Sequence, residues 1–184
     1  MIKAFAMKRF FKKVGLWIGL LLIVLILISF FLPKEFTVSR SITVNAPVDR
    51  VFDQVNDLRN WEKWSPWKRK DPTMEMTFSN PPVGQGAFYK WVSKDKHLGS
   101  GTCTLAKVTN YEEIVANFHF EDWGDSNTTF HFGHKGNDVE LTWSITSDVG
   151  MMPWSKYFGV AMKGMLKKQF DQGLTGIKFY AEKS

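Results

Sequence analysis

The chain has 184 residues, of which 44% are hydrophobic and 15% aromatic, and its formal net charge is +6. This length suits a single globular domain. The charge is uneven: residues 1–33 contain five Lys or Arg and no Asp or Glu, whereas residues 34–184 contain 19 basic and 18 acidic residues. The near-neutral remainder argues against nucleic-acid binding. A single cysteine, Cys103, excludes an intrachain disulfide framework and a multi-cysteine metal site.

An uncharged apolar segment occupies residues 14–32. Its 19 residues nearly match the ~20 that a helix needs to cross the hydrocarbon core of a bilayer. The alternative is a cleaved signal peptide, but its apolar region would have about 7–15 residues and a small-residue cleavage site. This segment ends in Phe30, Phe31, Leu32 and Pro33 instead, which favours a retained transmembrane helix.

Lys and Arg residues before the apolar segment predict its orientation. By the positive-inside rule, the basic residues 1–13 stay cytoplasmic and residues 33–184 form a domain on the other side. In a bacterium, this arrangement is a single-pass protein of the inner membrane with its soluble domain outside the cytoplasm. The predicted parts are therefore a basic N-terminus (1–13), a transmembrane helix (14–32) and one folded domain (33–184).

Residues 36–44 alternate in character and are rich in β-branched side chains, which predicts a strand. Pro47 then suits the first turn of a helix over residues 47–56, where Val48, Val51, Phe52 and Val55 share one face. A short helical turn is predicted at residues 61–64.

Six further strands are predicted, separated by turn signals, as in an antiparallel meander. Their ranges are residues 74–79, 87–93, 101–109, 113–120, 128–134 and 139–148. A long amphipathic helix follows from residue 154 to about residue 181. It contains four glycines, which are costly in a helix and indicate close packing or adjacent space. The order of elements predicts an α+β fold with helices against one face of an antiparallel sheet.

The chain also resembles the START-like, or helix-grip, superfamily, and within it the polyketide cyclase/dehydrase and lipid-transport group. The resemblance covers about residues 36–181, and it is carried by Asn45-Ala46-Pro47, Val51-Phe52, Val55-Asn56-Asp57, Trp61-x-x-Trp64-Ser65-Pro66-Trp67, Asp71-Pro72, Gly84-x-Gly86-Ala87 and Gly99-x-Gly101. It implies a curved seven-stranded sheet wrapped round the C-terminal helix, two short helices after the first strand, and an apolar cavity between sheet and helix. The N-terminal membrane segment departs from the soluble cyclases and argues against a soluble biosynthetic enzyme.

Three tryptophans, Trp61, Trp64 and Trp67, are spaced three residues apart after the first predicted helix. Core packing, the wall or entrance of a pocket, and contact with a membrane interface remain alternative interpretations, because indole suits all three settings. We treat Trp64 as a cavity candidate, and Trp61 and Trp67 as candidates for the membrane interface.

The alternation of the strands and the period of the last helix select side chains that point inward. With Trp64 from the tryptophan segment added, the cavity candidates are Trp64, Tyr89, Trp91, Phe118, Phe132, Leu141, Trp143, Phe158, Met162 and Met165. The alternative is that they only fill a core. The first hypothesis for function is a membrane-anchored domain that binds a lipid or another hydrophobic small molecule. Its rivals are a cyclase or dehydratase on the same fold, and a structural or interaction domain without a ligand.

Catalytic chemistry has little support in the sequence. Tyr89 is the one titratable side chain among the cavity candidates, and Cys103 suits a small buried residue better than a nucleophile. His119 and His131 point away from the apolar face of their strands. The sequence therefore predicts no catalytic residues, no metal site, no cofactor and no nucleic-acid partner. It leaves the oligomeric state open.

Overall fold

The computed structural model describes the backbone of residues 2–33, 35–122, 124–136, 138–148, 150 and 152–183, and their side chains except those of 2–11, 148 and 158. The chain divides into two compact units. One consists of Met1–Phe36 with Asp148–Met162, and the other of Thr37–Ser147 with Lys163–Ser184. The first turns of the C-terminal helix therefore group with the N-terminal segment, and the predicted domain boundary at residue 33 stays a prediction.

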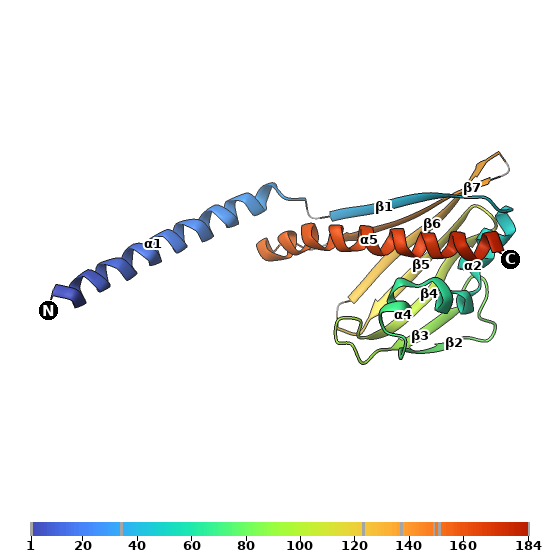
Figure 1. Cartoon of the computed structure of the whole chain (residues 1–184), viewed down its shortest axis with the longest axis horizontal. Helices are drawn as coiled ribbons and strands as arrows, with labels where there is room; N and C mark the ends of the chain where they lie inside the picture. The colour runs from blue at the N-terminus through green and yellow to red at the C-terminus, as the bar shows by residue number, and fades with distance from the viewer. Residues whose placement is uncertain are drawn as a thin grey trace. The chain divides into compact units, whose positions relative to one another are not determined.

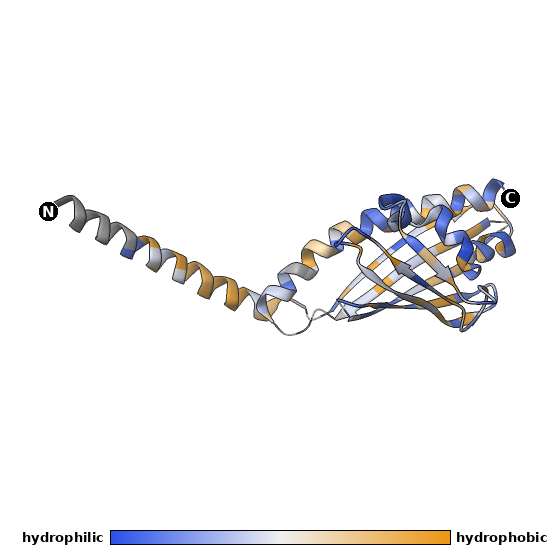
Figure 2. Ribbon diagram, turned by 90° about the horizontal axis from the view of Figure 1, so that it is seen from below, coloured by the Kyte–Doolittle hydropathy of each residue, from blue (hydrophilic) through white to orange (hydrophobic). Residues whose placement is uncertain are grey.

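The first unit contains helix α1 (Ile2–Phe31) and the first turns of α5 (Pro153–Lys183). Residues Lys12–Phe31 of α1 are long and apolar enough to cross a membrane. Most side chains from residue 14 to 31 are exposed, including those of Leu16, Trp17 and Phe31, and Figure 2 shows this stretch in orange. Most of the predicted span at residues 14–32 thus lies in a helix, and most of its apolar side chains are exposed among the described residues.

The second unit is built on an open seven-stranded sheet in the order β1-β7-β6-β5-β4-β3-β2 (Figure 1). The strands are β1 (Glu35–Val44), β2 (Glu75–Phe78), β3 (Phe88–Val92), β4 (Ser100–Thr109), β5 (Glu113–Phe120), β6 (Gly124–Lys135) and β7 (Asp138–Asp148). Strands β2 to β7 pair with their sequence neighbours in antiparallel register. Strand β1 lies beside β7, where Thr37 hydrogen-bonds Thr146 and Ser41 hydrogen-bonds Thr142.

Alternation along the strands determines which side chains form the core. On β5, Ile114, Ala116 and Phe118 are buried, and on β7, Val139, Leu141 and Trp143 are buried. The residues between them are more exposed, as the period of two requires. Phe118, Leu141 and Trp143, which the alternation predicted to point inward, are therefore buried on the inner face of the sheet.

Four short helical segments connect β1 to β2: α2 (Val48–Asn56), η1 (Leu58–Asn60), α3 (Trp61–Trp64) and α4 (Pro66–Lys70). The second half of α5 packs on the inner face of the sheet. Asp171 of α5 accepts two hydrogen bonds from the Arg40 guanidinium of β1, at 2.6 and 3.0 Å, and Lys178 donates to the Thr43 carbonyl at 2.7 Å. The predicted α+β, helix-grip architecture is confirmed.

Candidate functional site

Trp61 and Trp64 bind the last turn of α2. The final carbonyls of a helix have no partner within the helix. The indole N–H of Trp61 donates to the Val55 carbonyl and that of Trp64 to the Gln54 carbonyl, both at 2.8 Å. Each indole is 0% exposed. The spacing of three residues therefore places two indoles on neighbouring carbonyls and fixes α3 against α2.

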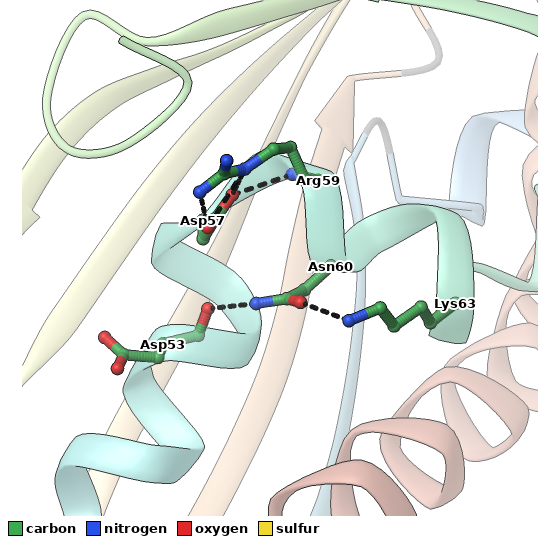
Figure 3. Close-up of polar contacts among 5 residues, drawn as sticks. All are labelled: Asp53, Asp57, Arg59, Asn60 and Lys63. Carbon is green, nitrogen blue, oxygen red and sulfur yellow. Dashed lines mark hydrogen bonds and ion pairs between the residues drawn. The ribbon is translucent and has the colours of Figure 1, made fainter. Parts of the chain in front are cut away.

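Polar side chains also join α2, η1 and α3 (Figure 3). The Asn60 side chain donates to the Asp53 carbonyl at 3.0 Å, and Lys63 donates to the Asn60 side chain at 3.0 Å. The hydrogen-bonded Arg59 guanidinium holds the pKa of the Asp57 carboxyl below its usual value. Because each of these groups already has a partner, the network has the features of a structural clamp.

An aromatic cluster joins α3, the sheet and α5. The rings of Trp61 and Trp64 lie 4.7 Å apart, and Trp64 meets the edge of Trp143 at 5.8 Å. Trp143 in turn stacks on Phe130 at 4.8 Å and on Phe170 at 4.1 Å. At this end, the space between sheet and helix is filled by side chains.

Trp67 lies at the border of the aromatic cluster. It belongs to α4, whose first turn is capped by the Ser65 hydroxyl. Its ring lies 6.1 Å from Phe118 and 5.9 Å from Trp143, and the residue is only half-buried. Trp67 therefore connects the buried cluster to the surface.

Two polar side chains of the inner face, Tyr89 and Cys103, satisfy each other. They occupy paired positions on β3 and β4 and form a hydrogen bond. Both are buried, and burial raises the pKa of the Tyr89 hydroxyl and of the Cys103 thiol well above their ordinary values. Both groups are therefore protonated at neutral pH.

Two hydroxyl side chains of β6 also belong to the inner face, and they differ in their hydrogen bonding. The Thr128 hydroxyl accepts from the Trp143 indole at 2.6 Å and donates to the Ser144 carbonyl at 2.8 Å. The Ser126 Oγ is shielded from solvent and has no hydrogen-bond partner among the described residues. Ser126 pairs in register with the aromatic residue Phe118 of β5.

Most of the cavity candidates lie in the interior, as residues with 0–7% exposure: Trp64, Tyr89, Trp91, Phe118, Phe132, Leu141 and Trp143. Ring contacts connect Tyr89, Trp91 and Phe118, whereas Phe132 packs against Phe52 of α2. Whether any of these residues contacts a ligand stays a prediction, because burial alone also fits a packed core.

Three candidates on α5 differ from the strand residues. Met162 is half-buried and Met165 is 49% exposed, so the helical period alone placed Met165 too far inward. The side chain of Phe158 lies outside the described residues.

The two membrane-interface candidates, Trp61 and Trp67, differ in their exposure. Trp61 is 0% exposed and bonded to Val55, which is the environment of a core residue and leaves no indole surface for lipid. Core packing was one of the three interpretations that remained open for this tryptophan, because indole suits all of these environments. Trp67 keeps a partly exposed ring and stays a candidate.

Ser126 was not among the candidates because Asp122–Asn127 reads as a turn in the sequence. In the structure, β6 begins at Gly124, before the predicted start at residue 128. The alternation of Ser126, Thr128, Phe130 and Phe132 could have extended the strand backwards. The turn composition of this stretch concealed that pattern.

The outer face of the sheet carries exposed polar pairs. His119 contacts Asp125 at 2.7 Å, with side chains that are 66% and 79% exposed. Within the described residues, no three His, Cys, Asp or Glu side chains are grouped so that they could hold a metal ion.

Comparison with known proteins gives a match over a range that includes nearly the whole second unit and the start of α5. A family model described as "Polyketide cyclase / dehydrase and lipid transport" matches residues 35–182. A search of curated proteins found no match.

Several solved structures have a similar fold. The DynU16 protein of the dynemicin biosynthetic locus is 17% identical with a TM-score of 0.56; the alignment covers 79% of this chain but only 47% of that protein. A Rhizobium leguminosarum protein is 13% identical, with a TM-score of 0.59 and coverage of 82% and 97%. A Chromobacterium violaceum protein is 16% identical, with a TM-score of 0.56 and coverage of 82% and 99%. At these identities, the likeness concerns the fold alone.

Proposed function

Because the chain belongs to the polyketide cyclase/dehydrase and lipid-transport family, we propose that it binds a lipid or another hydrophobic small molecule between the sheet and α5. The proposal includes an anchor: α1 crosses a membrane and holds the binding domain beside it. The family and the fold are common to proteins of different activities, so the site has to supply the argument for binding.

The Ser126 hydroxyl, which has no hydrogen-bond partner among the described residues, is the observation that carries the proposal. A buried hydroxyl without a hydrogen bond costs about 1–3 kcal/mol. An apolar ligand with one polar group would satisfy this hydroxyl and cover the rings beside it. Phe118 and the half-buried Trp67 then form the apolar border of the site, and the filled Trp64–Trp143 end closes it.

The chemistry of the inner face favours binding over catalysis. A general acid or base works best with a pKa near the operating pH. Burial raises the pKa of Tyr89 and of Cys103, which takes both groups away from that range. A cyclase or dehydratase would need another inward group, and no observation on the described residues favours one.

The anchor is supported by the exposed apolar surface of α1. Residues Lys12–Phe31 are long enough for a span, and Leu16, Trp17 and Phe31 are 69–90% exposed. In water, such a surface is unfavourable by about 25 cal/mol per Å². With the basic residues on its N-terminal side, α1 would leave the folded domain outside the cytoplasm of a bacterium.

Native mass spectrometry tests the binding proposal on the full chain, purified in mild detergent and then extracted with organic solvent. Three proteins are compared: wild type, Ser126→Phe, and Asn127→Phe. Ser126→Phe puts bulk on the inner face, whereas Asn127→Phe puts the same bulk at the exposed neighbouring position. Lipid that adheres to α1 is common to all three proteins.

The expected result is a stoichiometric apolar compound in wild type and Asn127→Phe that is lost in a folded Ser126→Phe protein. Equal amounts of bound compound in all three would assign it to α1 and refute binding in the interior. Bare masses in all three, in repeated preparations, would favour a packed interaction domain.

A further inference from the structure

The start of α5 is bonded to the end of α1. The Lys156 ammonium donates to the Ser29 carbonyl at 2.7 Å, and the Tyr157 hydroxyl donates to the Leu25 carbonyl at 2.7 Å. Lys156 is 8% exposed, which is unusual for a lysine. Both bonds lie within the first unit, so they fix the first turn of α5 against the last turns of α1.

These two hydrogen bonds determine where residues 156 and 157 lie relative to the C-terminal end of α1. The helix ends at Phe31, so the Ser29 and Leu25 carbonyls precede its end by two and six residues. At 1.5 Å per residue, they lie roughly 3 Å and 9 Å inside that end. If α1 crosses a bilayer, residues 156 and 157 lie at the level of the last turns of α1. They are therefore located at the membrane surface.

The surface of this segment is suited to such a position. Met152, Trp154 and Val160 are 57%, 70% and 59% exposed. Tryptophan is enriched at membrane interfaces, and a lysine can keep its stem in apolar surroundings while its ammonium reaches a polar partner. Between residues 149 and 170, the sequence has four lysines and no Asp or Glu, a balance that favours anionic headgroups.

We propose that residues 152–162, the start of α5, lie in the headgroup interface of the leaflet at which α1 leaves the membrane. The occupant of this apolar surface is the bilayer itself. The chain then contacts the membrane through two segments that are distant in sequence. This inference rests on the proposed membrane span of α1 and adds a second contact to it.

Site-specific fluorescence on the full chain in vesicles tests the inference. In a Cys103→Ala background, single cysteines at Trp154 or Val160 are labelled with an environment-sensitive nitrobenzoxadiazole dye. Gln172→Cys is the matched control, because Gln172 is an exposed residue farther along the same helix. Leu22→Cys reports the position of α1, where Leu22 is 54% exposed. The vesicles contain phosphatidylcholine and phosphatidylglycerol, with or without spin-labelled quencher lipids: the label is near the headgroup for positions 154, 160 and 172, and deep in the acyl chain for position 22, which lies near the middle of the span.

The expected result is at least twofold stronger quenching at positions 154 and 160 than at position 172, together with quenching at position 22. Quenching at position 22, with positions 154 and 160 no different from 172, would overturn this inference and leave the anchor standing. Absence of quenching at position 22 would overturn the anchor, and the inference with it. Circular dichroism of each labelled protein verifies that it is folded before the comparison is made.

Discussion

The rings of Trp143 and Phe170 stack almost parallel, with centroids 4.1 Å apart and 6° between their planes. One ring comes from β7 and the other from α5, so this pair determines how closely the helix approaches the sheet. Gly173 makes that approach possible, because a Cβ at this position would lie 2.5 Å from Cζ3 of Trp143.

Replacing Gly173 with alanine should therefore destabilise the domain. Alanine gains about 1 kcal/mol of helix propensity over glycine, but overpacking a core costs typically about 1–3 kcal/mol. Gly164→Ala is the matched control in the same helix, since nothing lies within 4 Å of its Cβ position. Urea unfolding should show a lower free energy of unfolding for Gly173→Ala and an equal or higher one for Gly164→Ala. If both substitutions stabilised the protein, the close approach would be wrong.

Replacing Ser126 with alanine should raise the free energy of unfolding and lower the affinity for the bound compound. In protein stripped of apolar compounds, Ser126→Ala should raise the free energy of unfolding by about 1 kcal/mol, because it removes a buried polar atom without a hydrogen bond. In the same variant, the affinity for the co-purified compound should fall by about tenfold, equivalent to about 1.4 kcal/mol. Asn127→Ala, at the exposed neighbouring position, should leave the affinity unchanged. Unchanged affinity in Ser126→Ala would remove this hydroxyl from the proposed site.

The indole hydrogen bonds on α2 predict a difference among the three neighbouring tryptophans. Trp61→Phe leaves the Val55 carbonyl without its 2.8 Å partner, and we expect a loss of about 1–3 kcal/mol in the free energy of unfolding. Trp67→Phe, at a half-buried ring, should cost less. Thermal or urea unfolding of the two variants makes the comparison. Equal losses would mean that packing, and not the N–H bond, determines the role of Trp61.

Asp71 should contribute to stability in a pH-dependent way. The Ser93 hydroxyl, and then Thr73, donate hydrogen bonds to its carboxylate and lower its pKa. A carboxyl with a lowered folded-state pKa stabilises the fold above its unfolded pKa, about 3.9, and this stability is lost as the pH falls through the folded value.

The free energy of unfolding of Asp71→Asn should therefore differ most from wild type at pH 7 and approach it below about pH 4. Urea titrations at pH 7, 5 and 3 test this difference. Asp122→Asn, at an exposed carboxyl, is the control and should follow the wild type. A deficit in Asp71→Asn that persists unchanged at pH 3 would contradict the assignment.

The sheet could be predicted from the sequence because its signals are local. The alternation of Val139, Leu141 and Trp143 reports burial on one face directly, and the turn residues between strands mark their ends. The helical period of the long helix α5 was equally clear in the sequence. It could not distinguish the buried Leu166 from the 49% exposed Met165.

The remaining features depend on contacts between distant residues. The sequence contains no signal that Lys156 bonds to Ser29, 127 positions earlier, or that Trp61 is a core residue and not an interfacial one. Ser126 was missed for another reason, because a strand with turn-like composition forms when its neighbour supplies the pairing.

The pairing of β1 with β7 has a consequence for how the protein is made. The hydrogen bonds Thr37–Thr146 and Ser41–Thr142 join residues 109 and 101 positions apart, whereas strands β2 to β7 form successive hairpins. Contacts this distant form late and slowly in folding. During synthesis, β1 therefore emerges first and finds its partner last, as an unpaired strand of the kind that seeds aggregation.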